Sequence, residues 1–260
     1  MSKVKAVAAG IWWVGGGSWG GLTEVLSDEG SGNVFLIGGQ GEYALIDAGM
    51  PDGAAAVLAN AAVAGARPAD IKRIIVTHCH HDHLAGAPEL KRRTGAAVAA
   101  SELAARALGG DAEARKRLFI RDGATLEVEQ VLADGDQVAL GPYAFTAMLT
   151  PGHIPDAVTL TGDVEGQKVV LTGDTAIGDQ GPAKGVVGWL DGHWGSNPKH
   201  LLRSIERISQ CQADLLLPGH GFPIQGAEKV RQSLEHCAER LRQLLAIPDL
   251  GTMMPLDLAD

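Results

Sequence analysis

Residues 77–83 read Thr77-His78-Cys79-His80-His81-Asp82-His83, and this stretch holds four of the nine histidines of the chain. It follows the apolar run at 74–76 and precedes Leu84-Ala85-Gly86. A buried structural histidine usually occurs alone, and a charged surface run is usually built from Lys and Glu rather than from His and Asp. Metal ligation therefore explains the cluster better than either alternative.

Within this stretch, a loop at the end of a strand can turn alternate side chains toward one point. His78 and His80 could bind one metal ion while Asp82 and His83 reach a second one. Neutral imidazole and carboxylate ligands suit Zn²⁺ and also Fe or Mn. The intervening Cys79 would point away, and we expect it to be a small buried hydrophobic residue.

Three further polar residues, His153, Asp174 and His220, each follow a strand-like run and lie in a glycine-bearing turn. Together with the first cluster they exceed what one tetrahedral ion needs, which favours a two-metal centre. Two divalent ions that share an aspartate and a water lower the pKa of that water from about 15.7 to about 7. Hydroxide at neutral pH is the nucleophile of a hydrolase, and no Ser/His/Asp arrangement is needed.

The composition excludes some classes of partner. The formal net charge is -9 and no basic cluster is longer than Lys91-Arg92-Arg93, so we expect no nucleic-acid partner and no anionic membrane surface. No stretch approaches the roughly 20 apolar residues that span a bilayer. A small-molecule substrate is the expected partner, and a homodimer is left open.

The cysteines and the N-terminal sequence predict a cytoplasmic protein. Cys79, Cys211 and Cys237 are widely spaced and odd in number, which is not the pattern of a disulfide framework. Gly10 and the run at 15–17 interrupt the N-terminal apolar residues, so no segment has the length of a signal peptide.

Apolar residues are spread evenly along the 260 residues, so we expect a single domain over 1–260, with 248–260 as a tail. We predict strands at 4–14, 34–37, 43–47, 73–77, 97–99, 125–132, 137–140, 143–149, 157–161, 168–171 and 214–217. We predict helices at 54–64, 87–93, 101–121, 198–209 and 227–246. The order of strand-rich and helical segments indicates an α/β (α+β) protein in which two mixed β-sheets pack together with helices outside.

The metal-binding motifs resemble the metallo-β-lactamase superfamily of metallo-hydrolases. Its pattern is His-x-His-x-Asp-His followed by a lone His, a lone Asp and a final His. The residues that match it in order are His78, His80, Asp82, His83, His153, Asp174 and His220. The match spans about residues 33–221, and it implies a four-layer αββα sandwich with the metals at one edge between the sheets.

The resemblance also implies a role for each matching residue. His78, His80 and His153 would hold the first metal, and Asp82, His83 and His220 the second. Asp174 would bridge two divalent ions, expected to be Zn²⁺, and Asp82 and Asp174 would be the catalytic carboxylates. Asp47 lies in the family's Asp-x-Gly turn and would orient the ligand stretch by hydrogen bonds, the alternative being an aspartate that only caps the turn.

Asp174 at the bridging position resembles the glyoxalase II, lactonase and other esterase-like branches, whereas the β-lactamases of the superfamily have cysteine or no ligand there. We therefore predict a dinuclear hydrolase whose metal-bridging hydroxide attacks an ester, lactone or thioester carbonyl. The alternatives are a phosphodiesterase or nuclease, an oxidoreductase like the persulfide dioxygenases with one iron, and a weak β-lactamase.

Three stretches could wall the substrate site: 15–33, the helical region 102–121, and 175–197. The loop after the bridging aspartate often faces substrate in this family, and glycines make it mobile here. The alternative is that its tryptophans pack the loop onto the body, and that its histidine is exposed rather than a proton donor to a leaving group. The candidate substrate-loop residues are Trp19, Trp189, His193 and Trp194.

Overall fold

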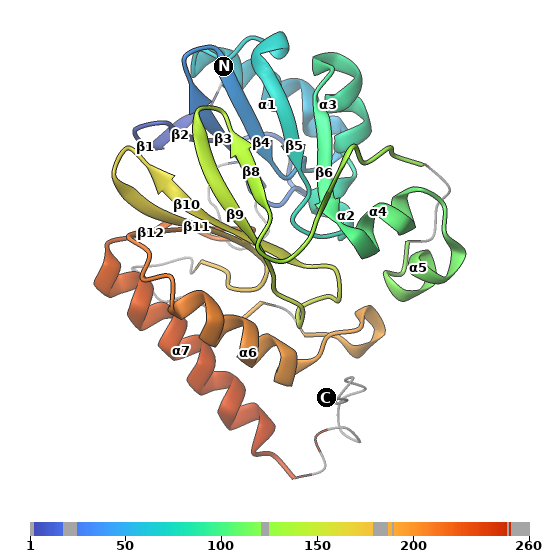
Figure 1. Ribbon diagram of the computed structural model, residues 1–260, viewed down its shortest axis with the longest axis vertical. Helices are drawn as coiled ribbons and strands as arrows, with labels where there is room; N and C mark the ends of the chain where they lie inside the picture. The colour runs from blue at the N-terminus through green and yellow to red at the C-terminus, as the bar shows by residue number, and fades with distance from the viewer. Residues whose placement is uncertain are drawn as a thin grey trace.

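The computed structural model describes residues 3–17, 25–120, 125–178, 187–188, 190–248 and 250, and their helices and strands form four layers (Figure 1). The first sheet contains β1 (Lys5–Ala8), β2 (Ile11–Gly15), β3 (Val34–Gly39), β4 (Glu42–Ile46), β5 (Ile71–Ile75), β6 (Ala97–Ser101) and β7 (Gln130–Leu132). The second sheet contains β8 (Gln137–Leu140), β9 (Tyr143–Leu149), β10 (Val158–Val164), β11 (Gln167–Gly173), β12 (Leu215–Pro218) and β13 (Ile224–Gln225).

The helices cover the outer face of each sheet. Helices α1 (Ala54–Val63), α3 (Ala87–Thr94), α4 (Glu102–Leu108) and α5 (Ala112–Arg117) belong to the half of the molecule that holds the first sheet, with the single turn α2 (His81–Leu84) at the ligand stretch. Helices α6 (Pro198–Ser209) and α7 (Ala227–Leu245) lie side by side below the second sheet in Figure 1. Short 3₁₀ turns lie at Pro51–Gly53, Pro68–Asp70 and Gly192–Trp194.

Both sheets are mixed. In the first, the strands run in sequence order from β1 to β7, antiparallel up to β4 and parallel from β4 to β7. In the second, the order is β13-β12-β11-β10-β9-β8, and β11 and β12 form its parallel pair. The prediction of two mixed sheets with helices outside is confirmed.

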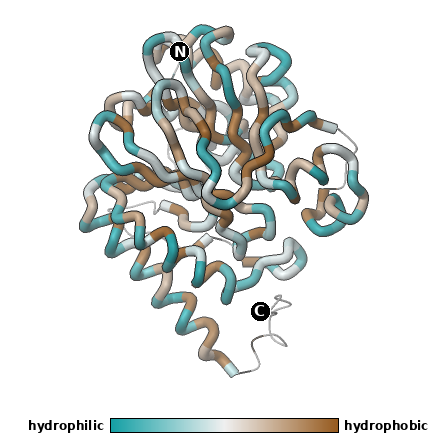
Figure 2. Tube along the Cα trace, viewed as in Figure 1, coloured by the Kyte–Doolittle hydropathy of each residue, from teal (hydrophilic) through white to brown (hydrophobic). Residues whose placement is uncertain are grey.

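Strand alternation builds three apolar layers between the four structural layers. In β3, Val34 and Leu36 pack with residues of the first helical layer, whereas Phe35 and Ile37 pack with residues of the second sheet. In β12, Leu216 packs with residues of α6 and α7, while its neighbours in the strand face the first sheet. Successive side chains of a strand point to opposite faces, so a stretch covered on both faces is apolar on both, as at 34–37 and 215–217. Figure 2 shows hydrophobic stretches along the strands.

Several predicted elements differ in extent from the structure, three of them markedly. The strand expected at 4–14 is divided into β1 and β2, because Gly10 has a φ of 73° and reverses the chain into a hairpin. The helical region expected at 101–121 is divided into α4 and α5, because Gly110 has a φ of 99° and the Asp111 side chain caps a new helix. Of the strand expected at 125–132, only Gln130–Leu132 pairs with β6.

Strand direction brings the predicted ligands to one edge. Asp47 follows β4 and His78 follows β5, which are parallel neighbours, so both leave the first sheet at the same edge. Asp174 and His220 follow the parallel pair β11 and β12. His153 follows β9, which runs in the direction of β11 because both pair antiparallel with β10. Of the helices in the described parts of the chain, none is both long and apolar enough to cross a membrane.

Truncation of Phe145 tests the layer between the two sheets. This ring is fully buried in the apolar cluster that both sheets share. We expect Phe145→Ala to lower the free energy of unfolding by about 3–5 kcal/mol, since the cavity cannot fill without moving both sheets. The matched control Val131→Ala, at a side chain that is 47% exposed, should stay within about 0.5 kcal/mol. Urea titrations giving the same loss for both variants would contradict this packing.

Candidate metal centre

The seven predicted ligands meet in two adjoining groups. In each group, one ligand atom per residue lies within 4.8 Å of the others. The first group consists of His78, His80, His153 and Asp174, and the second of Asp82, His83 and His220. The family resemblance implies the same grouping for the six residues other than Asp174, which it gives as the bridge between the two metals.

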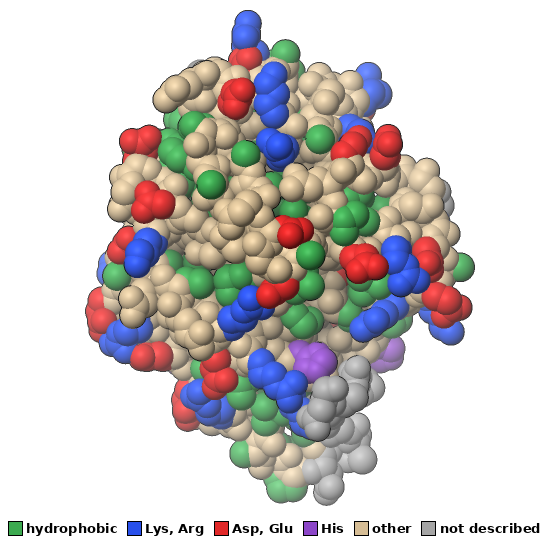
Figure 3. Space-filling model, in the orientation of Figure 1, with side chains coloured by type: hydrophobic (Ala, Val, Ile, Leu, Met, Phe, Trp, Pro, Cys, Tyr) green, Lys and Arg blue, Asp and Glu red, His purple; other side chains and the backbone are tan. Residues whose placement is uncertain are grey.

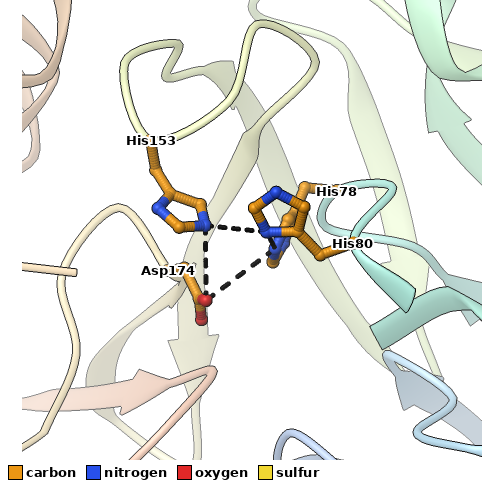
Figure 4. A group of neighbouring side chains, drawn as sticks. All are labelled: His78, His80, His153 and Asp174. Atoms are coloured by element: carbon orange, nitrogen blue, oxygen red, sulfur yellow. Dashed lines mark hydrogen bonds and ion pairs between the residues drawn. The ribbon is translucent and has the colours of Figure 1, made fainter. Parts of the chain in front are cut away.

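In the first group, three ring nitrogens converge on one point (Figure 4). His80 Nδ1 lies 3.1 Å from His78 Nε2 and 2.9 Å from His153 Nε2. Asp174 Oδ2 lies 3.4 Å from His153 Nε2 and 3.8 Å from His78 Nε2. Three imidazole nitrogens that converge at such distances can each present a lone pair to the same point, and a bound cation stabilises that arrangement.

The second group lies against the first. His83 Nε2 is 3.2 Å from His220 Nε2, and Asp82 Oδ2 is 3.0 Å from His220 Nε2 and 3.4 Å from His83 Nε2. Asp174 also reaches this group, with Oδ1 3.5 Å from His83 Nε2 and Oδ2 3.4 Å from His220 Nε2. Asp174 therefore lies between the two groups, where a bridging ligand would have to lie.

Burial and neighbouring charges set the protonation states. Burial lowers the pKa of His80 to about 3 and lowers that of His78 well below its ordinary value, so both rings are neutral at pH 7. Burial would raise the pKa of Asp174, but the histidines around it, His220 and His83 foremost, lower it well below its ordinary value. Burial would lower the pKa of His83 and His220 as well, but the neighbouring carboxylates Asp82 and Asp174 raise it, so these two rings must lose a proton when a metal ion binds. Neutral imidazole and ionised carboxylate are the forms that bind metal ions.

The donor set fits divalent metal ions. Asp174 Oδ1 is buried and has no hydrogen-bond partner among the described residues. Gly219 makes room for this carboxylate, because a Cβ at that position would lie 2.2 Å from Asp174 Oδ1. Buried histidine and aspartate ligands of this kind are typical of a divalent metal site, most often a zinc site.

Comparison with known proteins places this fold and site in a family. Residues 27–220 match the sequence profile of the metallo-beta-lactamase superfamily, which is most of the chain. The chain belongs to this superfamily.

Two relatives and one solved structure illustrate the similarity. A hydroxyacylglutathione hydrolase of Methylobacterium is 38% identical over 102 residues, which are 39% of this chain and 32% of that protein. An atrochrysone carboxyl ACP thioesterase of Aspergillus fumigatus is 25% identical over 214 residues, which are 82% of this chain and 58% of that protein. The chain thus spans less than two thirds of the length of either relative.

The solved structure is a metallo-beta-lactamase of Cronobacter sakazakii. Its TM-score is 0.71 at 21% identity, and the superposition covers 94% of this chain and 98% of that one. At this identity the likeness concerns the fold, and it agrees with the four-layer arrangement of the two sheets and their helices.

In this member of the superfamily, Asp47 holds the ligand stretch. Its Oδ1 accepts a hydrogen bond from the Thr77 backbone N–H at 2.8 Å, and its Oδ2 accepts bonds from Thr77 Oγ1 at 2.9 Å and from His83 Nδ1 at 2.8 Å. The bond to His83 directs the other ring nitrogen toward the second ligand group, as carboxylates behind metal-binding histidines do. Its geometry is that of the orienting role that the resemblance implies.

Asn33 is a positioning residue that the sequence reasoning missed. Its Nδ2 donates to the carbonyl oxygens of Pro218 and Gly221 at 2.9 Å each, and its backbone N–H donates to that of Gly219 at 2.7 Å. These bonds clamp the turn that carries His220. In the sequence, Asn33 is only a polar residue between a glycine and an apolar strand. That pattern occurs at many positions that have no role in a functional site.

The structure describes two of the four candidate substrate-loop residues, His193 and Trp194. The Trp194 ring lies edge-on to His80, with the ring centroids 4.9 Å apart, so this tryptophan packs against the ligand cluster. The His193 side chain is 75% exposed, as the alternative interpretation expects, and its Nδ1 lies 2.9 Å from Asp191 Oδ1. Trp19 and Trp189 lie outside the described residues.

Other features of the ligand stretch agree with the sequence analysis. Cys79 is 5% exposed within the first helical layer's apolar cluster, and His81 points to solvent. Asp156, which lies three residues beyond His153, is also buried, and burial raises its pKa to about 6.

Removal of the Asp47 carboxylate tests its support of the ligands. We expect Asp47→Ala to weaken metal binding by about 10–100-fold, because His83 and the Thr77 backbone lose their acceptor. Asp47→Asn is the matched control: it keeps an acceptor oxygen and tolerates the left-handed backbone at this position, where φ is 61°. Competition with a chromophoric chelator measures both affinities, and equal affinities of Asp47→Ala and the unaltered protein would exclude this role.

Proposed function

We propose that this protein is a metal-dependent hydrolase that cleaves ester, lactone or thioester carbonyls with two Zn²⁺ ions. One observation carries the proposal: Asp174 lies within 3.5 Å of nitrogens from both ligand groups. A carboxylate in that place can serve two ions at once, and it is an oxygen ligand rather than the sulfur of a cysteine. Oxygen at the bridging position is what the esterase-like branches have in common.

When bound, divalent ions supply Lewis acidity, which lowers the pKa of water and polarises a carbonyl group. The chain's own carboxylates divide the remaining work. The side chain of Asp174 is 8% exposed and is surrounded by histidines, so it fixes the distance between the two groups. The side chain of Asp82 is 26% exposed, so it is the carboxylate that can accept a hydrogen bond from an attacking water and orient it.

The side chains around the first group shape the approach of the substrate. Trp194 covers one side of His80 with an aromatic ring and excludes water there. The backbone that follows Trp194 is tied to the ligand turn, since Ser196 Oγ donates to the His153 carbonyl at 2.6 Å and the Asn197 N–H to that of Gly152 at 2.8 Å. The backbone at 196–197 is therefore anchored to the turn that carries the metal-ligand candidate His153.

Support for an acyl substrate also comes from the relatives. One is named a hydroxyacylglutathione hydrolase and another a carboxyl ACP thioesterase, so acyl transfer to water occurs on both. A thioester suits a site of this kind, because the leaving thiolate needs less help from a proton donor than an amine does.

Metal analysis joined to a substrate panel tests the proposal. We expect about two zinc ions per chain, and faster turnover of thioesters and lactones than of a chromogenic phosphodiester or a β-lactam. Chelation should abolish turnover and lower the melting temperature, because bound ions stabilise the folded state. A single iron per chain, or a phosphodiester as the best substrate, would overturn this assignment in favour of the oxidoreductase or the phosphodiesterase.

Substitutions at Asp174 and His193 separate the ligands from the exposed loop. We expect Asp174→Ala to lower kcat/KM at least about 100-fold with loss of bound metal, because both groups lose a ligand.

His193→Ala should leave kcat/KM within about twofold, since this side chain is mostly in solvent and bonded to Asp191. A large loss of kcat in His193→Ala at full metal content would make His193 the proton donor to the leaving group.

A further inference from the structure

A cavity between α4 and α5 is lined by residues other than the metal ligands. Its volume is about 430 Å³, which is within the range of sites for small molecules. Leu103 and Phe119 supply apolar walls, and Arg106, Lys116 and Arg117 supply cations. None of these residues belongs to either ligand group.

The charge of the cavity differs from that of the chain. The chain has a formal net charge of -9, and on the face drawn in Figure 3 cationic and anionic side chains intermingle. The cavity has three cations against one acid, Glu113. Arg106 is bonded to Asp111 through Nε at 3.1 Å and Nη2 at 2.7 Å, but no carboxylate among the described residues pairs with Lys116 or Arg117. Two cations beside an apolar wall are thus available to an anion.

The backbone at Phe119 is held in an unfavourable conformation. Its φ is 56°, and the bonds Phe119 N–H to Lys116 O (3.3 Å) and Ile120 N–H to Arg115 O (3.0 Å) form the motif that ends many helices. Glycine is the favoured residue at this position, and a bulky residue there is unfavourable because its Cβ crowds the backbone. The Phe119 side chain is nevertheless a wall of the cavity and is 42% exposed, so its contribution to the core does not explain it.

The cavity lies at the edge of the sheet that also carries the metal ligands. Helix α4 begins directly after β6, and the ligand stretch follows β5, its parallel neighbour. Parallel neighbours end at the same edge, and Figure 1 shows α4 and α5 beyond α2 on that side of the first sheet. A molecule in this cavity therefore lies on the same side of the fold as the proposed active site.

We propose that the cavity between α4 and α5 binds an amphipathic anion, an apolar chain or ring that ends in a phosphate or carboxylate. The apolar part packs between Leu103 and Phe119, and the anion meets Lys116 and Arg117. Arg117 can hold a phosphate or carboxylate with two parallel hydrogen bonds, and Lys116 adds a point charge.

Calorimetric titration of the metal-loaded protein with octyl phosphate tests this site directly. Octyl phosphate should bind at least about tenfold more tightly than either octanol or inorganic phosphate. Octanol lacks the anionic group, and inorganic phosphate lacks the apolar chain. Phe119→Gly should weaken binding about tenfold without lowering the melting temperature, since glycine relieves the backbone at this position. Lys116→Ser combined with Arg117→Ser should do the same, and the matched control Lys229→Ser on the exposed face of α7 should not.

Two results would overturn the proposal: equal binding of octyl phosphate and octanol, or unchanged octyl phosphate binding in Phe119→Gly. Neither result depends on hydrolysis. The binding proposal can therefore fail while the proposed function stands, and the proposed function can fail while the binding proposal stands.

The anion could be the remote end of the substrate or a separate small molecule. A rise of about tenfold in the KM of an anionic octanoyl thioester relative to a neutral short thioester in Phe119→Gly would assign the site to the substrate. An unchanged ratio together with weakened octyl phosphate binding would assign it to a separate ligand.

Discussion

The buried carboxylate of Asp47 connects the scaffold to the site. It ends β4 in a left-handed backbone conformation and accepts hydrogen bonds from Thr77 and His83, which follow the neighbouring strand. An unpaired buried carboxylate would be costly, so these bonds fix the position of the ligand stretch relative to the first sheet. The direction of the His83 ring, and with it the second ligand group, follows from this contact.

The second sheet supplies the remaining ligands from the ends of its strands. The parallel pair β11 and β12 delivers Asp174 and His220 to the edge where β5 delivers His78. The apolar layer between the sheets, which contains Phe145, sets the distance between these strand ends. Packing of apolar side chains thus decides whether five histidines and two aspartates come close enough to act together.

The arrangement of the ligand cluster is energetically unfavourable unless a cation binds between its side chains. Imidazole nitrogens face one another at about 3 Å, and Asp174 Oδ1 is buried without a hydrogen-bond partner among the described residues. Asn33, Gly219 and Asp47 hold this arrangement from outside, and the folded scaffold compensates for its cost. The strained backbone at Phe119 is a second local cost, and it too lies beside a place that fits a small ligand, the cavity between α4 and α5.

The sequence by itself determined the type of site and the layers of the fold. Ligand chemistry is a property of residue type, and the spacing of residues 78–83 and the alternation of apolar runs are local, so both can be read along the chain. The tertiary structure decided which ligands meet, because His83 and His220 are 137 residues apart and only strand pairing joins them. It also showed the hydrogen bonds of Asp47 to Thr77 and His83, the contacts of Asn33 and the α4–α5 cavity, since hydrogen bonds and cavities between distant segments depend on packing that no local pattern records.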